Sequence, residues 1–251
     1  MKNKLIKPLL VSFAVVFWIG VWWIGSIVVG DSYLLPDPVS VFTKLGEIIV
    51  SKDFLATVFY TMMRVLAGLF SGIILGIVLG IAAHHSKIVH SLLFPIISVI
   101  KATPVASFII ILLVILDGDL LTISIALLMV MPIIWQNVID AYESIDGALY
   151  EVCRVYGFSF GKRMRALYAP AIVKFLFPAI VTSVGLAWKS EIAAEIIAYT
   201  THSIGHEIYD ARFEYISEPV FAWTLIVIIM SICLEALVKF IVRRCERWVL
   251  K

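Results

Sequence analysis

The nearest approach to a catalytic motif is the glycine-rich segment 157–163, G-F-S-F-G-K-R. A phosphate-binding loop needs four residues between its glycines and a Ser or Thr after its lysine, because backbone amides cradle the phosphates and the hydroxyl binds magnesium. Here three residues separate Gly157 from Gly161, and Arg163 stands at the hydroxyl position. The segment therefore predicts that any nucleotide hydrolysis belongs to another chain.

A second group of polar residues, His202, His206 and Glu207, could bind a metal. The order His-Glu-Ile-Tyr-Asp after residue 205 lacks the second histidine of a zinc-protease helix, so a solvated loop is the better interpretation. We also find no Gly-x-Ser-x-Gly elbow. The sequence predicts no catalytic residue, no metal site and no cofactor on this chain.

Four charged residues fall inside long apolar segments: Lys101, Lys189, Glu191 and Glu195. A charge at the bilayer centre costs about 2.5–3.5 kcal/mol, so each should pair or face a wet cavity. Glu191 and Glu195 lie one helical turn apart. Lys101 reaching Glu191 across a translocation path is one interpretation, and a purely structural ion pair is the other. Arg64 and Lys174 are expected near the interfaces, where they can snorkel.

These charges must be positioned by membrane helices. The chain has 251 residues, of which 62% are apolar and 15% charged, and its mean hydropathy is +1.04. Soluble domains are about 45–50% apolar and about 25% charged. A membrane-spanning helix needs about 20 apolar residues. The sequence predicts an all-α, polytopic bundle of six transmembrane helices, at about 8–29, 57–83, 91–116, 120–137, 171–200 and 220–242.

The basic residues predict the orientation of this bundle. The segments 1–7, 84–90, 138–170 and 239–251 contain 13 of the 20 Lys and Arg residues, whereas the three segments on the other side contain three. Cytoplasmic loops are enriched in Lys and Arg. We therefore expect a multi-pass protein of the cytoplasmic membrane with both termini in the cytoplasm.

The spans divide the chain into four parts: an anchor helix (1–33), an outer connection (34–56), a helical core (57–242) with an inward loop at 138–170, and a basic cytoplasmic tail (243–251). In the outer connection, Asp37 can cap a short helix that begins at Pro38. Val41, Leu45 and Ile48 would then face the lipid boundary. A plain connecting loop is the alternative.

The second span contains glycines at a strict four-residue spacing, at Gly68, Gly72, Gly76 and Gly80. Residues four apart share one helix face, and glycines there allow a neighbouring backbone to approach closely. The spacing predicts a packing seam, either within the bundle or between subunits.

The inward loop at 138–170 carries the most specific pattern. Ser144 can cap a first short helix, Gly157 can end it in a left-handed conformation, and Ser159 can cap a second helix that stops before Pro170. An apolar patch at helical spacing in a loop that faces water usually contacts a partner. The patch comprises Leu149, Val152, Cys153 and Tyr156, beside Glu151 and Arg154 and next to the elbow of Gly157, Phe158 and Ser159.

This loop resembles that of the permease subunits of binding-protein-dependent ABC importers, which has the pattern E-A-A-x-x-x-G with a Leu-Pro about 12 residues later. Glu151, Gly157 and Pro170 match the pattern, whereas Val152 and Cys153 replace the alanines and Ala169 replaces the leucine. Further segments look like the subgroup that imports nitrate, sulfonates, taurine or thiamine-pyrimidine precursors: Leu34 to Pro38, Arg64 with the glycine series, Met131-Pro132 with Asn137, and Ser203 to His206 with Tyr209.

The resemblance implies a type I importer permease that forms the path for a small polar solute. It also implies a second permease copy, giving a homodimer, two ATPase subunits that hold ATP and magnesium, and an external substrate-binding protein. The loop from Leu149 to Ser159 would couple to the ATPase. The other partner is the lipid bilayer, and no nucleic acid is expected. An ion-gradient-driven secondary transporter or channel is the alternative.

Overall fold

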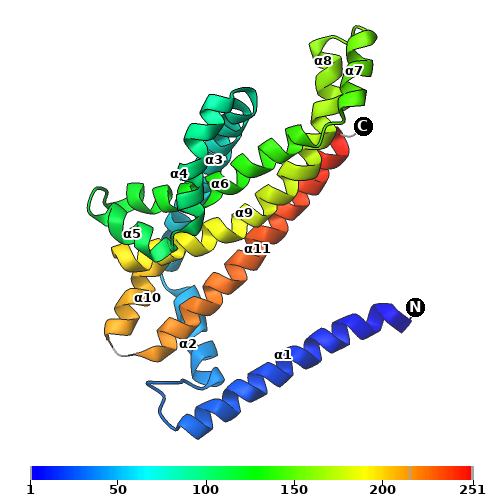
Figure 1. Cartoon of the computed structure of the whole chain (residues 1–251). Coiled ribbons are helices and arrows are strands. Elements are labelled where there is room, and N and C mark those ends of the chain that lie inside the picture. Colours follow the sequence, from blue (N-terminus) through cyan, green and yellow to red (C-terminus); the bar gives the residue numbers. More distant parts are fainter. Residues whose placement is uncertain (1, 215, 250–251) are drawn as a thin grey trace.

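The computed structural model describes residues 2–214 and 216–249, and every regular element in this part of the chain is a helix. Three helices form the centre: α3 (Phe54–His85), α6 (Gly118–Glu143) and α9 (Ala169–Ala198). The helix α11 (Ser217–Val249) runs alongside α9 (Figure 1). The main core lies between these helices and includes Trp188, Trp223 and Val130.

Five helices of the described part are long and apolar enough to cross a membrane, and a bent pair brings the number to as many as six. The bent pair is α4 (Lys87–Ala102) with α5 (Val105–Leu113), whose axes differ by 105°. The expected third span is therefore broken. Pro104 explains the break, since it cannot donate a helical hydrogen bond and disfavours helical geometry at the residue before it.

The glycine face of α3 lies against α6. Gly68, Gly72, Gly76 and Gly80 are all buried. A Cβ added to any of them would come within 2.4–2.8 Å of a Cβ on α6, which is closer than side chains can pack. The seam lies within one chain, and it fixes α3 and α6 as a pair.

The helix α2 (Pro38–Val50) packs against the N-terminal part of α11 (Figure 1). The Asp37 carboxylate accepts hydrogen bonds from the amides of Val39 and Ser40, as expected for the cap. The expected lipid-facing side of α2 is wrong, because Val41 and Ile48 are buried in the main core. These two side chains pack against other helices of the bundle, which the sequence alone did not reveal.

The helix α1 (Lys2–Val29) stands apart from the other long helices (Figure 1). Its C-terminal part is tied to the bundle through Trp22, which stacks on Phe221 and donates a hydrogen bond to the carbonyl of Pro36. At the other end of the chain, α11 extends to Val249, so residues 243–249 of the predicted basic tail are helical.

Candidate functional site

The loop between α6 and α9 folds into a helical hairpin. Its first arm is α7 (Gly147–Val155), and its second arm begins with α8 (Phe160–Arg163). Gly157 joins the arms with φ +62°, a conformation that glycine adopts without strain. The amide of Phe158 donates to the carbonyl of Cys153, and that of Gly157 to the carbonyl of Arg154, which closes α7.

The caps of this hairpin differ from those predicted. Asp146, not Ser144, caps α7 by accepting a hydrogen bond from the amide of Ala148. Ser144 instead ends α6. Ser159 occupies the capping position of α8 with extended backbone but forms no side-chain cap bond. Because α6 continues to Glu143, only two residues separate its end from Asp146, the cap of α7.

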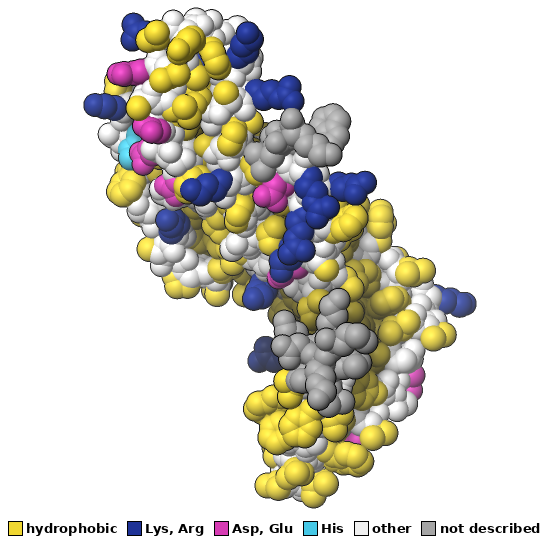
Figure 2. Space-filling view, turned by 90° about the vertical axis from the view of Figure 1, so that its right-hand side faces the viewer, with side chains coloured by type: hydrophobic (Ala, Val, Ile, Leu, Met, Phe, Trp, Pro, Cys, Tyr) yellow, Lys and Arg dark blue, Asp and Glu magenta, His cyan; other side chains and the backbone are white. Residues whose placement is uncertain are grey.

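The hairpin projects from the bundle, and its exposed surface is nevertheless largely apolar. Val155 is 83% exposed and Tyr156 is 76% exposed. Figure 2 shows hydrophobic side chains at the upper end of the molecule with lysine and arginine side chains around them. We call this the hairpin surface, which consists of Leu149, Tyr150, Val152, Val155, Tyr156 and Phe160.

The hairpin surface differs in membership from the predicted patch. Cys153 is buried, so it packs inside the hairpin and offers nothing to a partner. Val155 and Phe160 are exposed but fall outside the periodic set on which the prediction was based. A large apolar side chain anywhere in a charged, water-facing loop would have been the signal for them. Glu151 and Arg154 are exposed beside the surface.

The second arm continues without a stop into α9. Between them lies a π-helical turn, η1 (Met164–Tyr168), in which the amide of Ala169 donates to the carbonyl of Met164, five residues back. The prediction that the second helix stops before Pro170 is wrong. A wider turn accommodates the proline, which has no amide hydrogen. Residues 160–198 therefore form one continuous helical unit.

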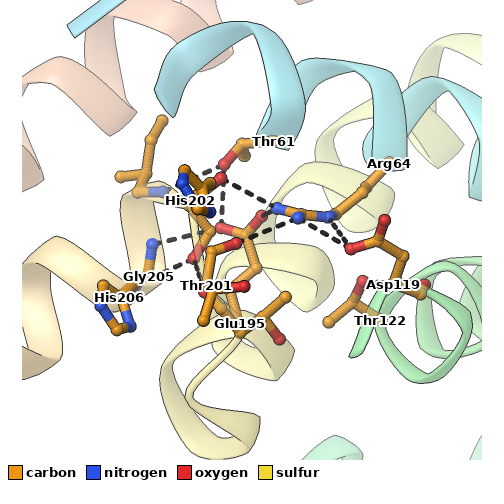
Figure 3. A network of polar contacts seen from close by, with 12 residues as sticks. Thr61, Arg64, Asp119, Thr122, Glu195, Thr201, His202, Gly205 and His206 are labelled. Carbon is orange, nitrogen blue, oxygen red and sulfur yellow. Dashed lines mark hydrogen bonds and ion pairs between the residues drawn. The ribbon is translucent and has the colours of Figure 1, made fainter. Parts of the chain in front are cut away.

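A second polar site lies around Arg64, at the end of the bundle far from the hairpin (Figure 1 and Figure 3). Arg64 is 6% exposed, so the prediction that it snorkels at an interface is wrong. Its Nε donates to Oδ1 of Asp119 at 2.8 Å, and its Nη1 pairs with Oε1 of Glu195 at 3.2 Å. Its Nη1 and Nη2 also donate to the carbonyls of His202 and Thr201.

Glu195 accepts three hydrogen bonds within this Arg64 network, one of them from Arg64. Its Oε2 accepts from the Thr61 hydroxyl at 3.1 Å and from the Gly205 amide at 3.2 Å. Gly205 lies in the first turn of α10 (Ile204–Phe213), where the positive end of the helix favours a carboxylate. A Cβ at Gly205 would come within 2.4 Å of the Glu195 Cβ. The network thus joins α3, α6, α9 and α10.

The predicted contact between Lys101 and Glu191 is not formed. Lys101 is exposed, whereas Glu191 is fully buried. Neither carboxylate oxygen of Glu191 has a hydrogen-bond partner among the described residues. The buried ion pair of this region is formed by Arg64 and Glu195 instead. Of the four intramembrane charges, the structure therefore brings Glu191 and Glu195 into the interior and leaves Lys101 and Lys189 on the surface.

The hairpin surface is suited to docking on another protein, and the Arg64 network is suited to holding helices in position. The hairpin surface offers exposed apolar side chains at the end of a continuous helix, which suits contact with another protein. The Arg64 network ties α3, α6, α9 and α10 together. Among the described residues there is no group of three or more His, Cys, Asp or Glu side chains that could hold a metal ion.

Comparisons with known proteins identify the family of this chain. The model of the family described as "Binding-protein-dependent transport system inner membrane component" matches residues 72–247. The putative aliphatic sulfonates transport permease protein SsuC of Bacillus subtilis is 26% identical over 92% of this chain and 84% of its own length. The taurine transport system permease protein TauC of Escherichia coli is 22% identical over 91% of this chain and 85% of its own.

The fold also matches a solved structure. A chain of the MetNI methionine ABC transporter, in an inward-facing conformation, superposes with a TM-score of 0.63 at 17% sequence identity. The match covers 79% of this chain and 97% of that chain. Since the family model covers most of the chain, this protein belongs to the inner-membrane components of binding-protein-dependent transport systems, the permease subunits of ABC importers, in which a separate subunit hydrolyses ATP.

Proposed function

We propose that this chain, as a homodimer, forms the translocation path of an ABC importer for a small polar solute of the sulfonate, nitrate, taurine or thiamine-pyrimidine precursor class. The relatives named for sulfonate and taurine transport support this class. An external binding protein delivers the solute, and two ATPase subunits that bind ATP and magnesium drive the transport. Both termini lie in the cytoplasm, on the side of the basic segments.

The observation that carries the proposal is the exposed hairpin surface at the inner end of α9. We infer that the hairpin, with Glu151, Arg154 and the Gly157 elbow, docks on the ATPase. Closure of two ATPase subunits around ATP would draw two docked hairpins together. Because residues 160–198 are continuous, this motion would pass directly into the bundle.

The coupling role is tested with two substitutions. Gly157→Pro imposes a negative φ where the elbow has +62°, and Glu151→Lys reverses a charge beside the hairpin surface. We expect both variants to insert normally but to lose most solute uptake per ATP hydrolysed, measured in vesicles that contain the permease and its ATPase. Gly147→Ala is the matched control, since a Cβ there meets no atom within 4 Å. Normal uptake by Gly157→Pro would contradict the docking role.

A further inference from the structure

A groove lies between α9 and α11, on the part of both helices that is nearer the hairpin (Figure 1). Its volume is about 530 Å³. Residues three, four or seven apart share one face of a helix, so each of the two helices presents a single face to this groove. We call it the α9–α11 groove, and its lining includes Lys174, Phe177 and Val181 on α9, and Lys239, Arg243 and Glu246 on α11.

The α9–α11 groove is positively charged. The described residues that line it include three basic side chains and one acid, Glu246. Lys239 pairs with Glu235 at 3.1 Å, whereas Lys174 and Arg243 form no ion pair with any residue that the structure describes. The three basic residues are exposed. Figure 2 shows lysine and arginine side chains gathered on this side of the molecule, with hydrophobic side chains beside them. The groove therefore presents two unpaired cations to a ligand.

The cations lie at the depth of lipid headgroups. We measure along each helix from the end far from the hairpin, at 1.5 Å per residue. Lys174 is 24 residues from that end of α9, about 36 Å, and Lys239 and Arg243 are about 33 and 39 Å along α11. A bilayer has about 30 Å of hydrocarbon and is about 40–45 Å thick with its headgroups. Val181, at about 26 Å, stays within the hydrocarbon, and Phe177 lies at its edge.

The groove opens on a surface that suits lipid. The large apolar side chains of Leu237, Phe240 and Ile241 are exposed on the same part of α11. A second copy of this chain is a poor occupant, because a two-fold contact centred on the groove would place its cations against the same cations of the other copy. The N-terminal helix of another copy is no better, since residues 1–7 contain three lysines. An anionic amphiphile matches both the charge and the apolar part of the lining.

We propose that the α9–α11 groove binds an anionic phospholipid such as phosphatidylglycerol. The lipid phosphate lies between Arg243 and Lys174, because a guanidinium group donates two parallel hydrogen bonds to phosphate oxygens and an ammonium group adds a point charge. One acyl chain follows Phe177 and Val181 into the hydrocarbon. Basic pockets between membrane helices bind anionic headgroups in this way. The site is separate from the cargo and from the ATPase contact of the proposed function.

The test maps lipid contacts directly. The complex of the permease with its ATPase is placed in nanodiscs of phosphatidylcholine that contain a trace of a photoactivatable lipid, with a diazirine in one acyl chain. The probe is either phosphatidylglycerol or phosphatidylcholine with the same chains. After illumination, the labelled peptides are identified by mass spectrometry. We expect phosphatidylglycerol to label residues 170–182 and 239–246 about fivefold or more above phosphatidylcholine, because each cation near the membrane surface contributes about fivefold.

Substitutions should change this preference in opposite directions. It should fall about fivefold in Lys174→Gln and in Arg243→Gln, and further in the double variant, whereas Glu246→Gln should raise it because the repelling acid is removed. Lys87→Gln is the matched control and should leave the preference unchanged, since Lys87 is an exposed lysine at the start of α4 and outside the groove. The single variants and Glu246→Gln carry the test if the double variant does not assemble.

Several results would overturn the lipid site. They are equal labelling by the two probes, no labelling of these segments by either probe, a preference that survives in Lys174→Gln and Arg243→Gln, or a lower preference in Glu246→Gln. Unlabelled phosphatidylglycerol should compete with the probe, and inorganic phosphate should not, because it has no acyl chain. Displacement by inorganic phosphate would show a site for a free anion instead. Labelling does not require transport, so a failure of the coupling role would leave this inference standing, and the reverse also holds.

Discussion

At the scale of single residues, Arg64 explains how the outer end of the bundle tolerates two acids. Its planar guanidinium reaches Asp119 and Glu195 in different directions and still has donors for two backbone carbonyls. Those carbonyls belong to a linker in which Tyr199 and His202 both have positive φ. The bonds from Arg64 therefore hold a backbone conformation that side chains disfavour.

Replacing Arg64 should be among the most destabilising single changes in the described part of the chain. Arg64→Met would leave Glu195 buried without a cation, a change that typically costs about 3–5 kcal/mol. We expect a clearly lower thermal unfolding temperature in detergent, with partial recovery in the double variant Arg64→Met with Glu195→Met. The exposed pair of Lys44 with Glu47 is the control, since Lys44→Met should cost less than about 1 kcal/mol. An unfolding temperature for Arg64→Met equal to that of Lys44→Met would contradict this role.

The Arg64 network also shows what sequence reasoning could not reach. The intramembrane acids were recognised, because a charge within an apolar run is visible locally. Their partner was not, since Arg64 and Glu195 are 131 residues apart and no local pattern joins them. Lys101 was a candidate partner because it is another charge within an apolar segment. It is exposed whereas Glu191 is buried, and a local pattern does not show which way either side chain faces.

At the scale of elements, the pairing of α3 with α6 rests on close approach of two backbones. A Cβ at Gly76 would lie 2.7 Å from the Ile134 Cβ and 2.8 Å from the Met131 carbonyl oxygen. The second contact is with backbone, so trimming Ile134 does not relieve it. The four-residue repeat predicted a seam from sequence. It could not name the partner helix, because several spans are comparably apolar.

Gly76→Ala should therefore separate the two helices and destabilise the bundle. Overpacking of this kind costs about 1–3 kcal/mol. The double variant Gly76→Ala with Ile134→Ala should remain destabilised, because alanine at 134 removes only the Cγ2 contact, and its Cβ and the Met131 carbonyl still block the new methyl group. Gly46→Ala on α2 is the control, because a Cβ there meets no atom within 4 Å. Thermal unfolding in detergent measures the differences, and full rescue by Ile134→Ala would show that the backbone contact is unimportant.

At the scale of the whole molecule, one helical unit joins the two sites. The hairpin begins its second arm at Phe160, and Glu195 lies 35 residues later, about 50 Å away at 1.5 Å per residue. The sequence predicted the hairpin and the span but separated them, because Pro170 was interpreted as a stop. The π-helical turn that carries the helix past this proline has no simple sequence signature. The continuous connection was therefore visible only in the structure.

The continuity of the helix over residues 160–198 should be necessary to couple ATP hydrolysis to uptake. Two glycines inserted between Ala169 and Pro170 would let the hairpin move without moving the rest of α9, since glycine pairs readily bend a helix. We expect the ATPase to stay bound and to hydrolyse ATP, while uptake per ATP falls by about 5–150-fold, the range of typical coupling energies.

The matched control for this insertion is the same glycine pair between Ser51 and Lys52, in the connection between α2 and α3, which lies outside the helical unit. Uptake, ATP hydrolysis and ATPase retention are measured on the same vesicles, so that loss of docking is distinguished from loss of transmission. If the insertion at Ala169 leaves uptake per ATP unchanged, force must reach the bundle through α6. That helix enters the hairpin from its other side, and its packing against α9 would then be the coupling contact.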